Sequence, residues 1–224
     1  MKNLLITFFT FLFCLTSSIG YSQNIVCEKT GYFCPEIDFK ELVLRDNNYY
    51  KKFSNQPFSG IVNGKEQGSL KNGKKEGSWL GYFDNGMLKS KGDYENGNRE
   101  GPWLGYFDNG NLHSKGDYKN GNREGPWLGY FDNGNLKTKG NFKNDKRIGL
   151  WIHYYKNGQL RRNGDYKNNK KDGSWIHYHE NGNLSSKGNF KNGKREGSWV
   201  WYNKDKTIWK LLTGTYKNGV KISD

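Results

Sequence analysis

The sequence is poor in the hydrophobic residues from which a globular core is built. Only 33% of its 224 residues are hydrophobic, whereas 30 residues are glycine. Aromatic residues make up 16% of the chain, so much of the apolar surface available for burial lies on rings. This composition argues against an ordinary globular core and indicates a thin, sheet-rich protein.

Cysteine is also scarce, and the first of the three stands apart from the others. Cys14 lies in a 12-residue, largely apolar run that begins at Leu4 and follows Lys2. The run is shorter than the ~20 residues that span a bilayer, and small polar residues follow it. This pattern predicts a signal peptide over residues 1–22, cleaved before Gln23. We therefore expect an exported protein, in the periplasm, on the cell surface or secreted.

The mature chain would keep Cys27 and Cys34, and export makes a disulfide between them the expected state. A metal site needs more ligands than these two, and none lie nearby. His177 and His179 alternate on one expected strand face, with His153 one repeat earlier. No acidic or cysteine ligand is placed to complete a zinc tetrahedron with them. The sequence therefore predicts no metal and no cofactor.

Motifs of enzymes are missing as well: there is no nucleophile elbow, P-loop or dinucleotide fingerprint. Four glutamates do recur, each one residue before a Gly-x-Trp tripeptide: Glu76, Glu100, Glu124 and Glu196. Neighbouring copies on adjacent hairpins would lie ~10 Å apart, too far for the carboxylate pair of a retaining glycosidase. Each follows Lys or Arg in a turn, which favours ion pairing there. We predict that the chain is not an enzyme.

Negative charge is in deficit. The formal net charge is +14, and loss of Lys2 leaves 35 Lys and Arg against 22 Asp and Glu, or +13. Such a charge supports solubility and also attracts anionic lipid, glycan or acidic protein outside the cytoplasm. Nucleic acid is not expected as a partner, because no recognised nucleic-acid motif is present in a chain predicted to be exported.

What the sequence does contain is a repeat. Six Gly-x-Trp tripeptides follow one another at a constant interval of 24 residues, with their tryptophans at Trp79, Trp103, Trp127, Trp151, Trp175 and Trp199. The units that start at Gly77 and Gly101 differ at only four positions. A fixed period of this length is typical of a linear array of structural repeats.

The sequence of each unit predicts a β-hairpin. An Asn-Gly pair between two alternating segments is a strong hairpin signal, because both residues tolerate positive φ. Frequent glycine disfavours helices after Asp46. We predict an all-β fold, an elongated single twisted antiparallel sheet of tandem β-hairpins. Its expected parts are a signal peptide (1–22), an N-terminal cap with a disulfide (23–56), a partial repeat (57–76), five 24-residue repeats (77–196) and a degenerate capping repeat (197–224).

The hairpin register decides which residues share a face. A two-residue turn would place Trp103 opposite Gly116. A three-residue loop ending in a bulged Gly110 would instead place Tyr106 opposite Leu112. We favour the second register, because it gathers one apolar face: Leu104, Tyr106, Leu112, Gly116 and Tyr118.

Trp103, Phe107, His113, Lys115 and Asp117 would then share the outer face, and an exposed strip of rings and lysines could bind a flat or repetitive partner. The candidate binding residues are Trp79, Phe83, Lys91, Trp103, Phe107, Lys115, Trp127, Phe131 and Lys139. The near-identical units of residues 77–148 are the first place to look for a site.

The recurring Gly-x-Trp, the tyrosine after it, the Asn-Gly turn and the Lys-Asn-Gly-Lys/Asn-Arg-Glu-Gly segment resemble the MORN (membrane occupation and recognition nexus) repeat variant. The resemblance covers about residues 57–224. It implies an elongated sheet of hairpins and a role in binding or scaffolding. Some bacterial members are labelled antitoxins, and MORN repeats have been linked to membrane lipids.

Together these observations predict a non-enzymatic exported scaffold that binds a protein or an anionic surface polymer. An antitoxin-like inhibitor of a toxin protein and a peripheral membrane-lipid binder are the alternatives. The sequence leaves the oligomeric state open.

Overall fold

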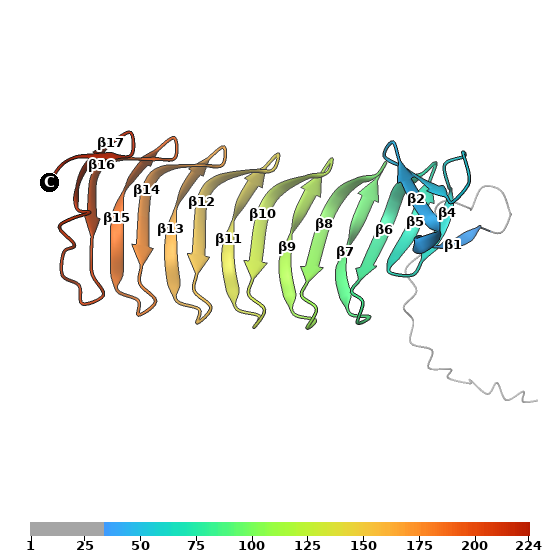
Figure 1. The fold of residues 1–224 in the computed structure, drawn as a ribbon, viewed down its shortest axis with the longest axis horizontal. Coiled ribbons are helices and arrows are strands. Elements are labelled where there is room, and N and C mark those ends of the chain that lie inside the picture. The colour runs from blue at the N-terminus through green and yellow to red at the C-terminus, as the bar shows by residue number, and fades with distance from the viewer. Residues whose placement is uncertain (1–33) are drawn as a thin grey trace, which may run out of the picture.

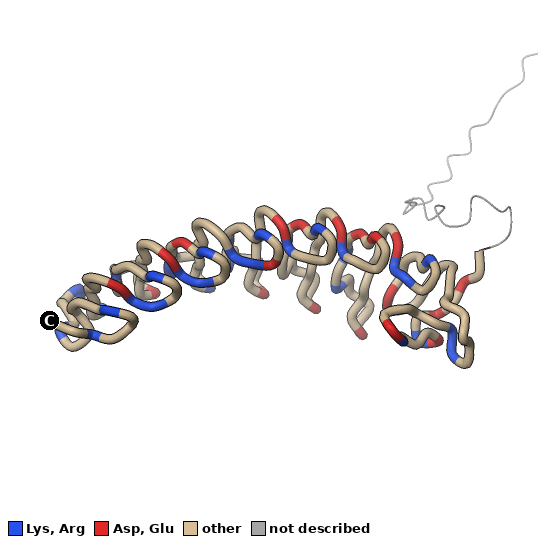
Figure 2. The backbone as a smooth tube through the Cα atoms, turned by 90° about the horizontal axis from the view of Figure 1, so that it is seen from above, with Lys and Arg blue, Asp and Glu red and all other residues tan. Residues whose placement is uncertain are grey.

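The computed structural model describes residues 34–224, which form one long sheet of hairpins (Figure 1). The predicted signal peptide and Cys27 lie outside these residues, whereas Cys34 is described and is disulfide-bonded. The sheet has 16 strands, and from β4 onward they lie side by side in chain order. Seen from above, the array is arched along its long axis (Figure 2).

The N-terminal segment contains β1 (Glu36–Asp38), the 3₁₀ helix η1 (Phe39–Glu41), β2 (Leu42–Arg45) and β3 (Asn48–Lys51). The array contains β4 (Gly60–Asn63), β5 (Glu66–Lys71), β6 (Lys74–Tyr82), β7 (Leu88–Glu95), β8 (Asn98–Tyr106), β9 (Leu112–Lys119), β10 (Asn122–Tyr130), β11 (Leu136–Lys143), β12 (Lys146–Tyr154), β13 (Leu160–Lys167), β14 (Lys170–Tyr178), β15 (Leu184–Lys191) and β16 (Lys194–Trp201), and ends with β17 (Gly214–Lys217) and β18 (Val220–Ser223). The pair β1–β4 is parallel, and β2 and β3 form a separate hairpin.

The predicted all-β array of tandem hairpins is confirmed. Within residues 34–224 the short η1 is the one helix, so no helix there has the length and apolar character needed to cross a membrane. Two groups of buried side chains serve as the core. One lies under the N-terminal segment and includes Val62, Leu70 and Trp79, and the other runs through the second half of the array.

Two kinds of turn alternate along the chain, and both follow from local sequence. In the Asp-Asn-Gly turn of β8–β9, the Phe107 N–H donates to Asn111 O at 2.8 Å and the Gly110 N–H to Phe107 O at 3.0 Å. Gly110 has φ 85°, as the bulged end of a three-residue loop requires. The opposite turn, at Asn120-Gly121, has φ 49° and 79°, the values of a two-residue type I′ turn.

The loop in the favoured register is confirmed, but the faces predicted from it are wrong. Tyr106 pairs with Leu112 as expected. A β-bulge then shifts the register by one residue, so that Gly105 pairs with Ser114 and Trp103 with Gly116. Because of the bulge, Trp103 lies on the same face as Gly116, and this face forms the core.

The six tryptophans of the Gly-x-Trp tripeptides are held by a contact that we call the Trp–Gly lock. Each ring lies over a glycine on the preceding strand, in the pairs Trp79/Gly68, Trp103/Gly92, Trp127/Gly116, Trp151/Gly140, Trp175/Gly164 and Trp199/Gly188. A Cβ atom at Gly92 would lie 2.4 Å from the Trp103 ring, so only glycine allows the ring to rest there. In five pairs the indole Nε1 also donates to a backbone carbonyl beside that glycine, at 2.9–3.2 Å.

Both rims of the sheet are tied from hairpin to hairpin. On the rim of the Asp-Asn-Gly turns, asparagine Nδ2 donates to a carbonyl of the next unit; Asn85 to Asp108 O is 3.0 Å. On the other rim, a turn N–H donates to the preceding hairpin, as from Gly97 to Lys75 O at 2.9 Å. These bonds recur along the array, so stacking repeats satisfies turn groups that a single hairpin would leave to solvent.

The lock predicts that Gly92→Ala destabilises the fold by about 3 kcal/mol, because a methyl group must displace the Trp103 ring. Gly105→Ala in the next strand is the matched control. Its Cβ would meet the Ser114 hydroxyl, which can rotate away, so the cost should stay under about 1 kcal/mol. Urea unfolding followed by tryptophan fluorescence measures both, and equal costs for the two variants would contradict the lock.

Candidate binding face

One face of the sheet carries a continuous row of aromatic rings. Tryptophans alternate with the tyrosine or phenylalanine of the following strand, and neighbouring rings mostly meet edge to face with centroids 5.0–6.5 Å apart. The row is Trp79, Tyr94, Trp103, Tyr118, Trp127, Phe142, Trp151, Tyr166, Trp175, Phe190, Trp199, Trp201 and Tyr216. Edge-to-face contact is the arrangement that the ring quadrupole favours.

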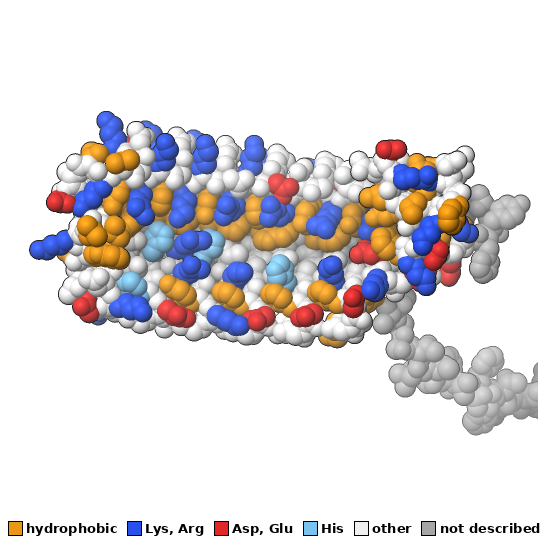
Figure 3. Space-filling view, in the orientation of Figure 1, with side chains coloured by type: hydrophobic (Ala, Val, Ile, Leu, Met, Phe, Trp, Pro, Cys, Tyr) orange, Lys and Arg blue, Asp and Glu red, His pale blue; other side chains and the backbone are white. Residues whose placement is uncertain are grey.

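A basic side chain lies over the rings once per hairpin. Six such residues recur every 24 positions: Lys75, Arg99, Arg123, Arg147, Lys171 and Arg195. Their charged groups lie 4.0–5.8 Å from the centroids of the rings beneath them. This is cation–π geometry. We call rings and cations together the aromatic–cation ladder; Figure 3 shows an orange band with blue side chains along this length of the molecule.

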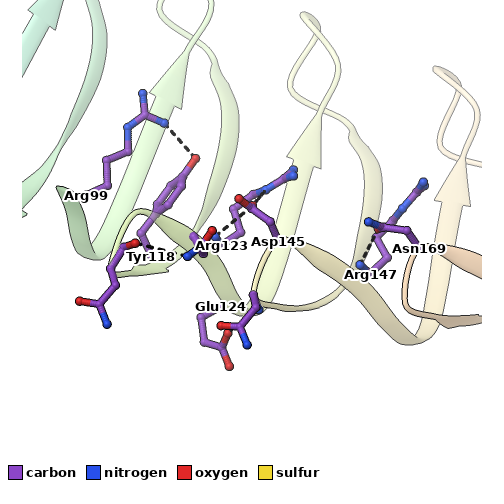
Figure 4. Close-up of polar contacts among 10 residues, drawn as sticks. Arg99, Tyr118, Arg123, Glu124, Asp145, Arg147 and Asn169 are labelled. Carbon is purple, nitrogen blue, oxygen red and sulfur yellow. Dashed lines mark hydrogen bonds and ion pairs between the residues drawn. The ribbon is translucent and has the colours of Figure 1, made fainter. Parts of the chain in front are cut away.

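The ladder cations differ in their polar partners (Figure 4). Lys75 pairs with Glu66 at 3.0 Å, and Arg123 Nε with Asp145 Oδ1 at 2.7 Å. Arg99 instead donates to the Tyr118 hydroxyl at 3.0 Å. Arg147 makes the equivalent bond to the Tyr166 hydroxyl, two hairpins further, at 3.2 Å. Within residues 34–224, the other four ladder cations form no ion pair with a carboxylate.

The predicted binding residues do not share one face. Trp79 and Trp103 are buried, with 2% and 7% of their surface exposed, and Trp127 is half-buried. The lysines Lys91, Lys115 and Lys139 are exposed and pair with Leu80, Leu104 and Leu128, whose side chains point away from the ladder. Phe83, Phe107 and Phe131 are half-buried beside the Asp-Asn-Gly turns, on the ladder face by strand alternation. The grouping was wrong because the bulge separates tryptophan from lysine.

The recurring glutamates also have a different role from the one expected. Glu76 accepts a bond from the Asn96 N–H at 2.9 Å, and Glu100 accepts one from the Asn120 N–H at 2.7 Å. Each carboxylate therefore caps the turn of the next hairpin, and the basic residue before it stacks on the ladder. The expectation of ion pairs inside these turns was wrong, because the two neighbouring side chains point to opposite faces of the strand.

Comparison with known families matches the MORN repeat variant over residues 75–96, 99–120, 123–144, 147–168 and 171–192. The chain belongs to the MORN-repeat-variant family. No curated protein matches it in sequence. Each matched MORN unit begins at a ladder cation and ends at the asparagine of the next turn. Each unit of the family thus contains one ladder cation, the rings beneath it, and a turn, which in four of the five units is capped by the glutamate or aspartate of the same unit.

The fourth and fifth MORN units differ from the first three on the ladder face. At one position of the repeat the residues are Gly81, Gly105 and Gly129, followed by His153, His177 and Trp201. His153 stacks on Trp151 and His177 on Trp175, with centroids 6.2 and 5.9 Å apart. The change from glycine to larger residues is visible in the sequence, but the stacking of the new side chains on the tryptophans is visible only in the structure.

An open hollow of ≈ 390 Å³ lies where these larger residues stand, and we call it the C-terminal hollow. It is lined by basic and histidine side chains, aromatic rings and two serines, including Arg161, Arg162, Lys171, His177, Arg195 and Trp209. The hollow lies C-terminal to residues 77–148, and the expectation that a site lies within those residues stays a prediction. Within the described residues, no group of three or more His, Cys, Asp or Glu is placed to hold a metal ion.

Burial and neighbouring positive charge change the protonation of this region. Burial, followed by the field of Arg162, lowers the pKa of His153 to about 4, and burial with the field of Lys171 does the same for His177. Burial, followed by repulsion from Arg162, lowers the pKa of Lys171 to about 8. Both histidines are therefore neutral at neutral pH, and the positive charge of the hollow comes from arginine and lysine.

These shifts predict that the MORN array loses stability between pH 6.5 and 4. The unfolded histidines bind protons below about pH 6.5 and the folded ones only near pH 4, so acid favours the unfolded chain in this window. Discounted for solvent screening, the loss is on the order of 1 kcal/mol per histidine. Urea unfolding at pH 7 and 4.5 measures it. A double variant, His153→Gln with His177→Gln, should lose less between the two pH values; an unchanged loss would contradict the assignment.

Proposed function

We propose that the chain is an exported, non-enzymatic binding scaffold whose aromatic–cation ladder binds an anionic polymer of the cell surface. The observation that carries the proposal is the row of six cations on one face, four of which have no carboxylate partner within residues 34–224. Two strands per hairpin place successive cations ~10 Å apart. A ligand that repeats its own negative charge can engage several of them together.

The ladder also supports binding through its rings. Stacked arginines are held in place by the rings below, so they lose little freedom when an anion binds. Chemistry would need a nucleophile, a general base or a metal, whereas the ladder presents cations and rings only. MORN-variant repeats are in general non-catalytic scaffolds, which supports the same reading for this chain. An acidic protein surface would meet the same row of charges and is the second kind of partner we consider.

Export is the part of the proposal that rests on residues 1–22. If these residues are a signal peptide, mass spectrometry of the natively produced protein should find a mature chain that begins at Gln23 in the envelope or culture fraction. A chain that keeps Met1 and remains in the cytoplasmic fraction would contradict export and would favour the antitoxin-like alternative.

The ladder is tested with two double variants that remove the same charge from opposite faces. Arg99→Gln with Arg147→Gln removes two ladder cations, and Lys91→Gln with Lys139→Gln removes two lysines from the other face. We expect the ladder variant to bind an immobilised carboxylated polysaccharide about tenfold more weakly, with a smaller dependence on salt. The control should stay within about twofold.

The outcomes separate the alternatives. Equal losses in the two double variants would show binding by net charge alone and would contradict a ladder site. Binding to anionic vesicles at low salt, with none to polysaccharide, would favour the peripheral membrane binder. Preference for single-stranded DNA would overturn the expectation that nucleic acid is not a partner, since rings and cations suit that ligand too.

A further inference from the structure

The C-terminal hollow concentrates positive charge without compensation. Four basic side chains line it: Arg161, Arg162, Lys171 and Arg195. Its lining contains no aspartate or glutamate, and within the described part of the chain none of the four forms an ion pair. Like charges held close together repel one another, and a bound anion would remove that repulsion.

Two of these cations are also partly withdrawn from water. The Arg162 Nε atom is buried and has no hydrogen-bond partner. Burial lowers the pKa of both Arg162 and Lys171, and neighbouring cations add to the effect at Lys171. A carboxylate in the hollow would neutralise part of this repulsion, and guanidinium groups bind carboxylates in a fork.

Rings form the remainder of the wall. Phe190, Trp199 and Trp201 belong to the ladder, and Tyr155 lies beneath Arg161, whose guanidinium is 5.6 Å from the ring centroid. Trp209 extends from the segment after β16 and is 46% exposed, and its backbone N–H donates to Trp201 O at 2.9 Å. An exposed indole at the edge of a charged hollow offers a flat apolar surface to a ring-shaped ligand.

We propose that the C-terminal hollow is a subsite for a carboxylated sugar unit of an anionic polysaccharide. The sugar's carboxylate lies among the four cations, and the C–H face of its ring packs on Trp209 and the neighbouring aromatic rings. Ser185 offers its hydroxyl group to the sugar's own hydroxyls, whereas the Ser186 hydroxyl is buried and bonded to His177 Nδ1 at 3.2 Å. The inference rests on the proposed function, because it assigns one unit of the polymer to one place on the ladder.

The combination of groups favours this ligand over simpler anions. Inorganic phosphate would use the cations and leave the rings exposed, and a neutral sugar would use the rings and leave the cations unpaired. The hollow is also continuous with the ladder through Phe190, Trp199 and Arg195. A chain that starts in the hollow can therefore run along the ladder toward the N-terminal hairpins.

The test is isothermal titration calorimetry of the full chain with a trimer of galacturonic acid, a neutral glucose trimer and inorganic phosphate. Each hollow variant has a matched control that removes the same contact outside the hollow. Arg195→Gln is compared with Arg45→Gln, since both arginines lie over aromatic rings and Arg45, 4.2 Å from the Tyr50 ring centroid, lies outside the ladder. Arg161→Gln is compared with Lys137→Gln, since each cation lies over one ring at 5.6 and 5.5 Å.

We expect the acidic trimer to bind and the neutral trimer not to bind. Arg195→Gln and Arg161→Gln should each lower the affinity about tenfold, while their controls stay within about twofold. Trp209→Ala should weaken the acidic trimer and leave the weaker binding of phosphate unchanged. Melting temperatures show whether a variant is folded, and the exposed Arg161 and Trp209 keep the test decisive if Arg195→Gln unfolds the chain.

Three results would overturn the inference. Equal losses for Arg45→Gln and Arg195→Gln would show that the trimer binds by net charge alone, which removes the subsite. Phosphate binding as tight as that of the acidic trimer would reduce the hollow to a general anion site. Absence of trimer binding would reject the subsite, while binding of the long polymer to the ladder decides the proposed function separately.

Discussion

The packing of each tryptophan on a glycine of the preceding strand is the constraint on which the structure depends. A hairpin sheet one layer thick has no interior in which to bury large side chains, so each ring must be buried by residues on the same face of the sheet. The ring packs on the glycine, meets the neighbouring tyrosine or phenylalanine edge to face, and is covered by a basic side chain. Repeated along the array, this arrangement makes the core and the proposed binding surface the same layer of atoms.

The need to cover the rings explains why positive charge lies along the ladder face. A lysine or arginine over a ring covers apolar surface with its aliphatic part and keeps its charge in water. The cations that cover the core are thus also those of the proposed binding face. Charge on the opposite face has no such support, since Lys115 and its equivalents extend freely beside half-buried leucines. A partner that reads rings and charge together would discriminate between the two faces.

Differences among the repeats make the ladder face uneven along the array. In the first three units, glycine and small side chains leave the ladder face smooth beside the rings, as at Gly105 and Ser114. In the later units, histidine, arginine and tryptophan occupy these positions and enclose a hollow. A linear array can therefore combine general affinity, spread over many repeats, with specific recognition of a ligand by a few of them.

The sequence by itself determined the hairpins of the repeat array and the turns that join their strands. Asn-Gly pairs and a bulged glycine such as Gly110 act through local backbone conformation, so a single copy carries the information, and the 24-residue period repeats it. Only the tertiary structure decided which face is the core. That choice depends on a one-residue bulge near His113, stabilised by contact between a ring and a glycine on neighbouring hairpins. The gathering of Arg162, Lys171 and Arg195 into one hollow likewise depends on packing between repeats, which no single repeat encodes.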